Sequence, residues 1–311
     1  MVYESFVKGS SIYAAPAEVD GLALYINEEL LQGVGGQIPT NWTDFTNIAL
    51  KMTVRDQQGI KTAGAAMGTS GNVDHFSDIL AVMMLQNGVD LTKIIIGDEK
   101  RDQLAIDAVD FYTIFAKSGD ARTWDDTLES STLAFAAGKL AFYFGPSWRA
   151  FEIKTANPQL NFKIAPIPQL PGEKVNWASY WVEGVSAKSK NKQAAFDLLK
   201  FMAQPETLQT LYAEAAKLRL FGEPYSVVSL GQSLAQDPFV GAYIQQAPTA
   251  QSFPAAAATF DNGLNDRIIK FFKDAVNSVN SGTNTKTALE TLSKGIAQVY
   301  SQFGLTASPA Q

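Results

Sequence analysis

The chain has no cysteine and only one histidine, His75, among its 311 residues, and both scarcities exclude kinds of site. Without cysteine there is no disulfide scaffold and no thiolate to hold zinc or an iron–sulfur cluster. A single histidine gives no histidine-based catalytic metal site, and no G-x-S-x-G motif is present to supply a nucleophilic serine. Phosphate-binding glycine motifs and spaced acidic calcium loops are also missing, so we expect neither a cofactor nor a metal.

Positive charge and long apolar runs are scarce as well. The 25 Lys and Arg are outnumbered by 31 Asp and Glu, which gives a net charge of −6. Nucleic-acid binding needs clustered positive charge, so no nucleic-acid partner is expected. The apolar run Ile79–Leu85 is far shorter than a membrane span, and Lys139 divides the longer stretch Leu133–Gly145. The opening MVYESFVKGS lacks the basic and apolar regions of an export signal, so we expect no signal peptide in this chain.

Apolar and aromatic residues, by contrast, are plentiful. The chain is 46% hydrophobic and 11% aromatic but only 18% charged, which is typical of a well-packed globular protein. Strand-like segments such as Leu140–Phe144 alternate with helical patterns, among them Trp42–Thr53, Asp125–Ala137 and Pro205–Ala216. This alternation predicts an α/β fold, and the length favours two lobes.

The stretch Ser11–Leu31 organises the expected fold. Pro16 separates two apolar strand-like runs, so the segment is interpreted as a chain that crosses from one lobe to the other. The second run, Gly21–Ile26, is apolar enough that we expect it to be buried on both faces inside a sheet. A second proline-marked crossing is expected at Ala165–Pro168, and Trp181–Met202 is expected to return beside the first strand. Two lobes joined by crossing strands leave a cleft, and such clefts bind ligands.

Aromatic residues at predicted loops and helix starts are the candidate binding residues. Their flat apolar faces with a polar edge suit stacking on a sugar ring, although core packing is the alternative for each. Trp148 follows the predicted strand Leu140–Phe144, at a turn that begins with Gly145–Pro146. Three further aromatic residues crowd the predicted loop Gly172–Tyr180 and its end, and His75 and Phe76 start a helix after a glycine-rich loop. The candidates are Trp148, Trp177, Tyr180, Trp181, His75 and Phe76.

The acidic residues allow a second interpretation. A pair of carboxylates across a cleft performs glycosidic hydrolysis, and 31 acids leave room for such a pair. No spacing singles out a pair, so a secreted carbohydrate-active hydrolase stays an alternative. A surface carbohydrate-binding or adhesive protein is a third.

Several segments occur in an order that resembles a known family. They are SIYAAPAEVDGLALYINEELL, PTNWTDFTNIALKMT, STLAFAAGKLAFYFGPSW, FKIAPIPQLPG and VEGVSAKSKNKQAAFDLLKFM. Together they resemble the sugar-type extracellular solute-binding proteins of ABC importers, the maltose-binding-protein relatives. The most specific parts are the proline crossover, the Trp-Thr-Asp-Phe helix start and the aromatic strand that runs into Gly-Pro-x-Trp.

The resemblance implies an α/β, two-lobed, periplasmic-binding-protein-like fold of type II with hinge crossovers. Residues 1–17 and 167–217 would form the N-lobe, and residues 18–166 and 218–311 the C-lobe. It implies noncatalytic capture of a sugar or oligosaccharide between the lobes and delivery to permease subunits. It also implies an extracytoplasmic, monomeric protein that meets the membrane only through a lipid anchor missing from this chain.

The resemblance also suggests contacts and shows departures. Trp148 is the best stacking candidate. Glu18 and Asp20 could accept hydrogen bonds from sugar hydroxyls, and roles in capping or in the hinge suit them equally. Asp261 is a weaker candidate for ligand binding. Family members begin with an export signal and further N-lobe sequence, so an incomplete N-lobe with weaker binding and exposed apolar patches is expected. The loop 218–224, LRLFGEP, also departs from the family pattern.

Overall fold

The computed structural model describes residues 7–8, 11–91, 99–256 and 262–305. Its strands are β1 Val7–Lys8, β2 Ser11–Ile12, β3 Ala15–Pro16, β4 Asp20–Gly21, β5 Ala23–Asn27, β6 Val54–Asp56, β7 Gly59–Ala65, β8 Leu140–Gly145, β9 Phe162–Ala165, β10 Asn176–Ser179, β11 Val182–Glu183 and β12 Ala250–Gln251. Its α-helices are α1 Glu28–Gly33, α2 Trp42–Met52, α3 Phe76–Gln86, α4 Glu99–Thr113, α5 Ser131–Ala136, α6 Arg149–Ala156, α7 Lys192–Met202, α8 Pro205–Ala216, α9 Val228–Gly231, α10 Gly241–Gln246, α11 Leu264–Asn280 and α12 Thr285–Gln302. Short 3₁₀ turns lie at Gln232–Leu234 and Ala247–Thr249.

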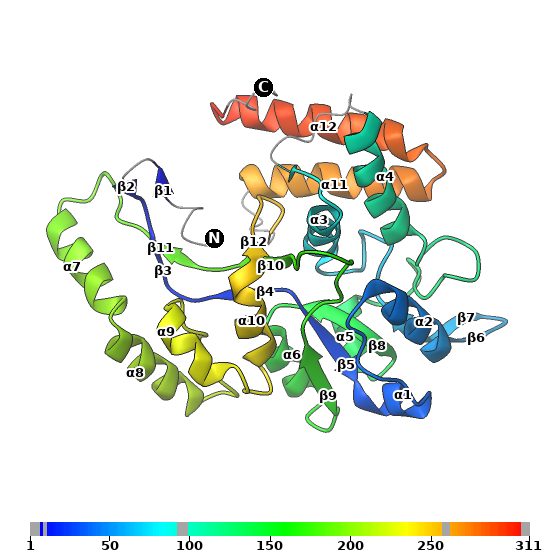
Figure 1. Cartoon of the computed structure of the whole chain (residues 1–311), viewed down its shortest axis with the longest axis horizontal. Coiled ribbons are helices and arrows are strands. Elements are labelled where there is room, and N and C mark those ends of the chain that lie inside the picture. Colours follow the sequence, from blue (N-terminus) through cyan, green and yellow to red (C-terminus); the bar gives the residue numbers. More distant parts are fainter. Residues whose placement is uncertain (1–6, 9–10, 92–98, 257–261, 306–311) are drawn as a thin grey trace.

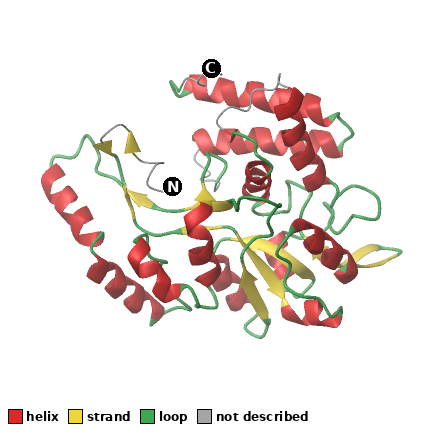
Figure 2. Cartoon of the chain, viewed as in Figure 1, coloured by secondary structure: helices red, strands yellow, loops and turns green. Residues whose placement is uncertain are grey.

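A five-stranded mixed sheet in the order β6-β7-β8-β5-β9 forms the centre of the larger part of the molecule (Figures 1 and 2). β7 and β8 are parallel, whereas β5 is antiparallel to both β8 and β9. Every residue of β5 and β8 is buried, because their sequences ALYIN and LAFYFG carry apolar residues on both faces. The expected burial of the second apolar run of the opening stretch is thus confirmed.

Helices cover both faces of this sheet. Phe45 of α2 stacks on Phe142 with ring centroids 5.0 Å apart, while Phe135 of α5 lies 5.5 Å from the ring of Tyr143. Successive residues of a strand point to opposite faces, so α2 and α5 lie on opposite sides of β8. The long helices α11 and α12 pack lengthwise on each other and contact α4 (Figure 1). We call this assembly the body.

A smaller unit extends from the body along the chain crossings. β3 pairs with β11 antiparallel, and α7 and α8 follow β11 (Figure 1). We call β3, β11, α7 and α8 the arm. The prediction that Trp181–Met202 returns beside the opening strand is confirmed by the pairing of Val182 with Pro16.

The second crossing between the lobes was predicted at Ala165–Pro168, and this prediction is wrong. Gln169 donates its backbone N–H to Thr40, and Gln86 donates to the carbonyl of Pro168, so this segment stays on the body. The chain then forms β10, which pairs with β4 on one side and β12 on the other, inside the expected loop Gly172–Tyr180. The crossing therefore lies between β10 and β11.

The predicted helices agree with the structure to different extents. The predicted helix Pro205–Ala216 is confirmed to the residue, and Trp42–Thr53 ends one residue early. The predicted helix Asp125–Ala137 is shorter, because the carboxylate of Asp125 accepts the backbone N–H of Thr127 and fixes a turn before α5.

The arm exposes apolar side chains. No residue of α7 is buried, and Leu208 is the single buried residue of α8. Exposed apolar residues on these helices are Phe196, Leu198, Phe201 and Leu211. The arm therefore presents apolar surface to solvent.

Candidate functional site

A cavity of about 160 Å³ lies where the first crossing, the start of α3, the turn after β8, the end of β10 and α11 meet. Its lining residues are Gly21, Leu22, Asp74, His75, Phe76, Ser77, Asp78, Pro146, Trp148, Arg149, Ser179 and Ile269. Three predicted site residues from two separate segments, His75, Phe76 and Trp148, therefore meet at one cavity. We call it the Trp148 cavity.

The turn that carries Trp148 is fixed from behind by buried groups. Asp20 accepts the backbone N–H of Ser147 at 3.0 Å and its hydroxyl at 2.8 Å. The buried hydroxyls of Tyr25 and Tyr243 donate to the carbonyls of Pro146 and Gly145. Because its neighbours are held in this way, Trp148 can project its ring to the surface, where it is 41% exposed.

Charged and polar groups surround the Trp148 ring. The guanidinium carbon of Arg149 lies 4.3 Å from the ring centroid, and the ring of His75 meets it edge-on with centroids 6.0 Å apart. Arg149 donates Nε–H to Nε2 of His75 at 3.0 Å and pairs with Glu152 through Nη1. An aromatic face thus lies beside hydrogen-bonding groups of both kinds, as sugar recognition requires.

Two carboxylates complete the polar wall. Asp74 is partly buried, which acts to raise its pKa, but hydrogen bonds from the Thr132 side chain and backbone hold that pKa below its usual range. Asp78 is buried and accepts the indole N–H of Trp177 at 2.7 Å. Asp74 is therefore an ionised hydrogen-bond acceptor at neutral pH. One carboxylate oxygen of Asp78 is already used by the hydrogen bond from Trp177.

The other predicted aromatic residues lie outside this cavity's lining. Trp177 is only 2% exposed, and its ring is packed in the core behind Asp78. Tyr180 is half-buried and Trp181 is 70% exposed, both on the crossing between β10 and β11. The predicted candidate Asp261 lies outside the described residues.

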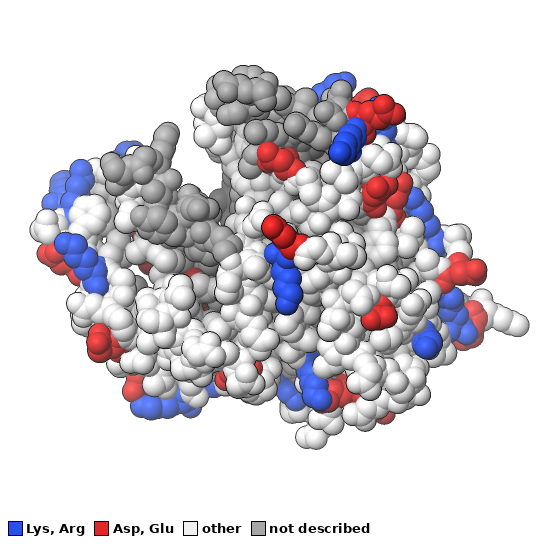
Figure 3. Space-filling view, in the orientation of Figure 1, with Lys and Arg blue, Asp and Glu red and all other residues white. Residues whose placement is uncertain are grey.

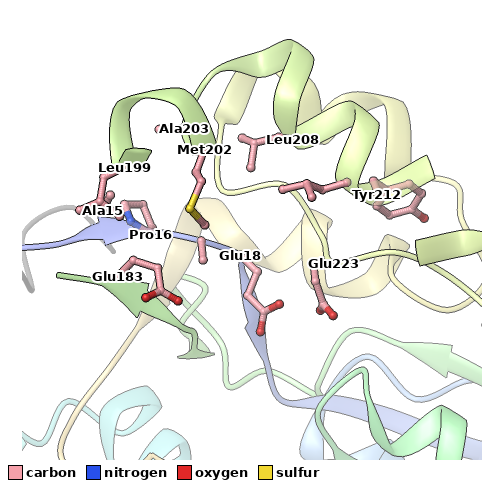
Figure 4. Close-up of a pocket in the computed structure, with 12 residues that line it drawn as sticks. Ala15, Pro16, Glu18, Glu183, Leu199, Met202, Ala203, Leu208, Tyr212 and Glu223 are labelled. Carbon is pink, nitrogen blue, oxygen red and sulfur yellow. The ribbon is translucent and has the colours of Figure 1, made fainter. Parts of the chain in front are cut away.

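Glu18 belongs to a second cavity, of about 120 Å³, between the first crossing and the helices of the arm (Figure 4). Its carboxyl group lies beside that of Glu223 (Figure 4). Glu223 also pairs with Arg219. Burial and the hydrogen bond to Glu223 raise the pKa of Glu18 to about 9, whereas the pKa of Glu223 is lowered by its hydrogen bonds from Glu18 and Arg219 against the effect of burial. Glu18 therefore donates its proton to the Glu223 carboxylate.

Asp20 lines neither cavity. Burial raises its pKa to about 7, although the hydrogen bonds from Ser147 and Gly21 oppose that rise. Its four acceptor contacts go to Ser147 and Gly21, so its observed contacts are those of a residue that fixes the crossing and the adjacent turn.

The sequence analysis missed five polar residues of the Trp148 cavity: Asp74, Ser77, Asp78, Arg149 and Ser179. Their signal was adjacency, because Asp74 and Asp78 bracket the predicted His75–Phe76 helix start and Arg149 follows Trp148 directly. Ser179 likewise precedes the predicted candidate Tyr180, but its segment was expected to be a loop and not the strand β10.

Within the part of the chain that the structure describes, no group of three or more acidic or histidine side chains is arranged to hold a metal ion. Over the same residues, no helix combines the length and apolarity that crossing a membrane requires. Figure 3 shows Lys and Arg interspersed with Asp and Glu on one face of the molecule.

An α/β body and an arm joined by paired crossing strands, with an aromatic and polar cavity beside the crossings, define the periplasmic-binding-protein class of fold. The chain belongs to the bacterial extracellular solute-binding proteins, whose family model matches residues 4–219. The predicted family and fold class are thereby confirmed.

Similarity to individual proteins agrees with this assignment. A maltooligosaccharide ABC transporter solute-binding lipoprotein of Streptococcus pneumoniae is 26% identical over 257 residues, which cover 78% of this chain and 56% of the relative. The chain thus spans little more than half the length of that relative. A cyclo/maltodextrin-binding protein solved with maltotetraose shares the fold with a TM-score of 0.73 at 17% identity, over 96% of this chain and 73% of the other. The structure of a sugar-binding protein of Xanthomonas citri matches with a TM-score of 0.72 at 18% identity, over 97% of this chain and 74% of the other.

Proposed function

We propose that the protein captures a sugar or oligosaccharide at the Trp148 cavity and delivers it to the permease of an ABC importer. The observation that carries this proposal is the half-exposed Trp148 ring beside donors and acceptors from Arg149, His75, Asp74 and Ser179. The pneumococcal relative is described as binding maltooligosaccharides, and a solved relative holds maltotetraose. We extend that ligand class, and the location on the outer side of the cell membrane, to this chain.

We propose further that the arm and the body are the two lobes of a hinged binder. The first crossing contributes Gly21 to the Trp148 cavity and Glu18 to the arm-side cavity, so it connects both. We assign residues 167–179 to the body because of their contacts there, which shortens the predicted N-lobe range 167–217 by this segment. Ligand contacts from both lobes would favour the closed state by their differential affinity.

The same cavity supports binding over hydrolysis. A glycosidase needs one carboxyl group with a raised pKa as its acid and a second carboxylate opposite it. Asp74 has a lowered pKa, and Asp78 is bonded to Trp177. We expect maltotetraose to remain intact after long incubation with the protein, as measured by chromatography; the appearance of shorter sugars would support the hydrolase instead.

A thermal-shift screen tests the binding proposal, because a ligand that binds only the folded state raises its melting temperature. Maltotriose, maltotetraose and mannobiose are the first probes. For any sugar that binds, Trp148→Ala should weaken binding by about 2 kcal/mol, roughly thirtyfold in Kd, through loss of a stacked apolar face.

Phe303→Ala is the matched control for that substitution. Phe303 is 44% exposed and lies under the guanidinium of Arg267 at 5.4 Å, at the end of α12, so it copies the setting of Trp148 away from the cavity. Its Kd should equal that of the wild type. An unchanged Kd in Trp148→Ala would contradict the proposed site. The absence of a thermal shift with any sugar would contradict the proposed function.

A further inference from the structure

The Trp148 ring does not present both of its faces to a ligand. The guanidinium of Arg149 covers the other face at 4.3 Å from the ring centroid. That guanidinium is held at two atoms, since Nε donates to His75 and Nη1 pairs with Glu152. The position of Arg149 therefore decides how the Trp148 ring is presented.

The bond between Arg149 and His75 fixes where the imidazole carries its proton. Arginine is always protonated and only donates, so Nε2 of His75 must be the acceptor in the 3.0 Å contact. A neutral imidazole then carries its single proton on Nδ1. That Nδ1 lies 3.8 Å from Oδ2 of Asp78, whose negative charge favours a proton on the near nitrogen.

Asp78 is itself held by a bond from outside the cavity. Its Oδ1 accepts the indole N–H of Trp177 at 2.7 Å, and both side chains are buried. This bond joins α3 to β10 across 99 positions of the chain and leaves Oδ2 directed toward His75. Trp177 is not among the lining residues, and its indole N–H reaches the cavity wall through the bond to Asp78.

We propose that Asp78, anchored by Trp177, is a positioning residue that keeps the sole histidine in its Nδ1–H tautomer. Nε2 of His75 then accepts the Nε–H of Arg149. The guanidinium of Arg149 covers one face of the Trp148 ring and leaves the other face for a sugar. The ligand part of this proposal rests on the proposed function, whereas the tautomer part concerns the ligand-free protein.

The test uses the fact that the chain has one histidine, so its imidazole gives one unambiguous set of signals. Long-range ¹H–¹⁵N correlation spectra of the ligand-free 311-residue protein should show Nδ1 protonated and Nε2 bare. The Nε–H of Arg149 should be protected from exchange with water. In Asp78→Asn the charge is lost, and in Trp177→Phe the anchoring N–H is lost while the ring remains. Both variants should gain a measurable Nε2–H fraction and lose protection at Arg149.

Trp42→Phe is the matched control. Trp42 is 5% exposed and donates its indole N–H to Gln86 at 2.6 Å, at the opposite end of α3. This variant removes an equivalent bond from the same helix but should leave the His75 and Arg149 signals as in the wild type. Circular dichroism and melting curves establish that each variant is folded.

Binding of maltotetraose, measured by calorimetry, gives the second readout. Where the wild type binds, Kd should rise about tenfold in Asp78→Asn and Trp177→Phe, equivalent to one hydrogen bond to a charged group. Wild-type signals in both variants would overturn the positioning role, as would equal changes in Trp42→Phe. An Nδ1–H tautomer that depends on Asp78, without binding of any probe sugar, would support the positioning and count against the proposed function alone.

Discussion

Glu18 is a carboxyl group that keeps its proton at neutral pH, because partial burial and the neighbouring Glu223 both oppose its ionisation. Its pKa of about 9 lies far above the ordinary value of 4.5. Since the folded state binds this proton more tightly than the unfolded state, the resulting stability is complete below about pH 4.5. It is lost as the pH rises through about 9.

We therefore expect the wild-type protein to lose free energy of unfolding between pH 7 and pH 9. For one proton the slope cannot exceed about 1.4 kcal/mol per pH unit. Glu18→Gln keeps a donor for the Glu223 carboxylate but does not titrate, so its stability should change less over the same range. Urea denaturation at pH 6, 7, 8 and 9 measures both proteins, and identical slopes would contradict the shared proton. Lys217→Gln, which removes the exposed partner of Glu214 on α8, is the control that should keep the wild-type slope.

Residues of the candidate site were predictable only where their signal is local. Trp148 follows from the strand, Gly-Pro and aromatic sequence that places it at an exposed turn, and His75 and Phe76 follow from a helix start after a glycine-rich loop. The bond between Trp177 and Asp78 spans 99 positions, so no local pattern indicates that this tryptophan is buried behind the cavity. The roles of all of these residues in ligand binding stay predictions.

At the scale of elements, α2 rests directly on β7 at a glycine. A Cβ added to Gly64 would lie 1.8 Å from the carbonyl oxygen of Ala49 and 2.5 Å from the hydroxyl of Thr53. Both atoms belong to α2 or its C-terminal end, and Ala49 is buried. The helix could accommodate a side chain only by moving away from the sheet.

Gly64→Ala should therefore lower the free energy of unfolding by about 1–3 kcal/mol through overpacking. Chemical denaturation monitored by circular dichroism measures the loss. In Gly33→Ala, at the end of α1, the new Cβ meets nothing within 4 Å and the backbone has no positive φ. That variant should equal the wild type or gain up to about 1 kcal/mol. Equal stabilities of the two variants would contradict the close approach.

The elements themselves were partly predictable, and the reason differs by type. Long amphipathic helices such as α2 and α8 carry a repeating pattern that identifies them locally. β10 has four residues and gains its place by pairing with β4 and β12, which lie far away in sequence. For this reason the second crossing was predicted at Pro166–Pro168, whereas that segment is hydrogen-bonded to Gln86 of α3 and, through Gln169, to Thr40 just before α2.

At the scale of the whole molecule, the exposed apolar side chains of the arm favour association between copies of the protein. Phe196 and Phe201 lie on α7, which has no buried residue at all. We expect the protein to bind a hydrophobic dye and to self-associate with rising concentration. Light scattering after size-exclusion chromatography measures the second effect.

Phe196→Ser combined with Phe201→Ser should reduce dye binding at least twofold and shift the protein toward the monomer. Leu133→Ser is the matched control, because Leu133 on α5 is 57% exposed, the same as Phe201, but belongs to the body. A monomeric wild type at all concentrations, without dye binding, would show that these side chains are harmless in solution.

The distribution of the five tryptophans gives the protein a built-in optical signal. Trp42, Trp124 and Trp177 are buried, whereas Trp148 and Trp181 face solvent. A Trp181→Phe variant would leave Trp148 as the one solvent-facing indole, and its long-wavelength emission would report occupancy of the cavity without any attached dye. Under the proposed function, such a variant would serve as a reagent-free sensor of sugar binding.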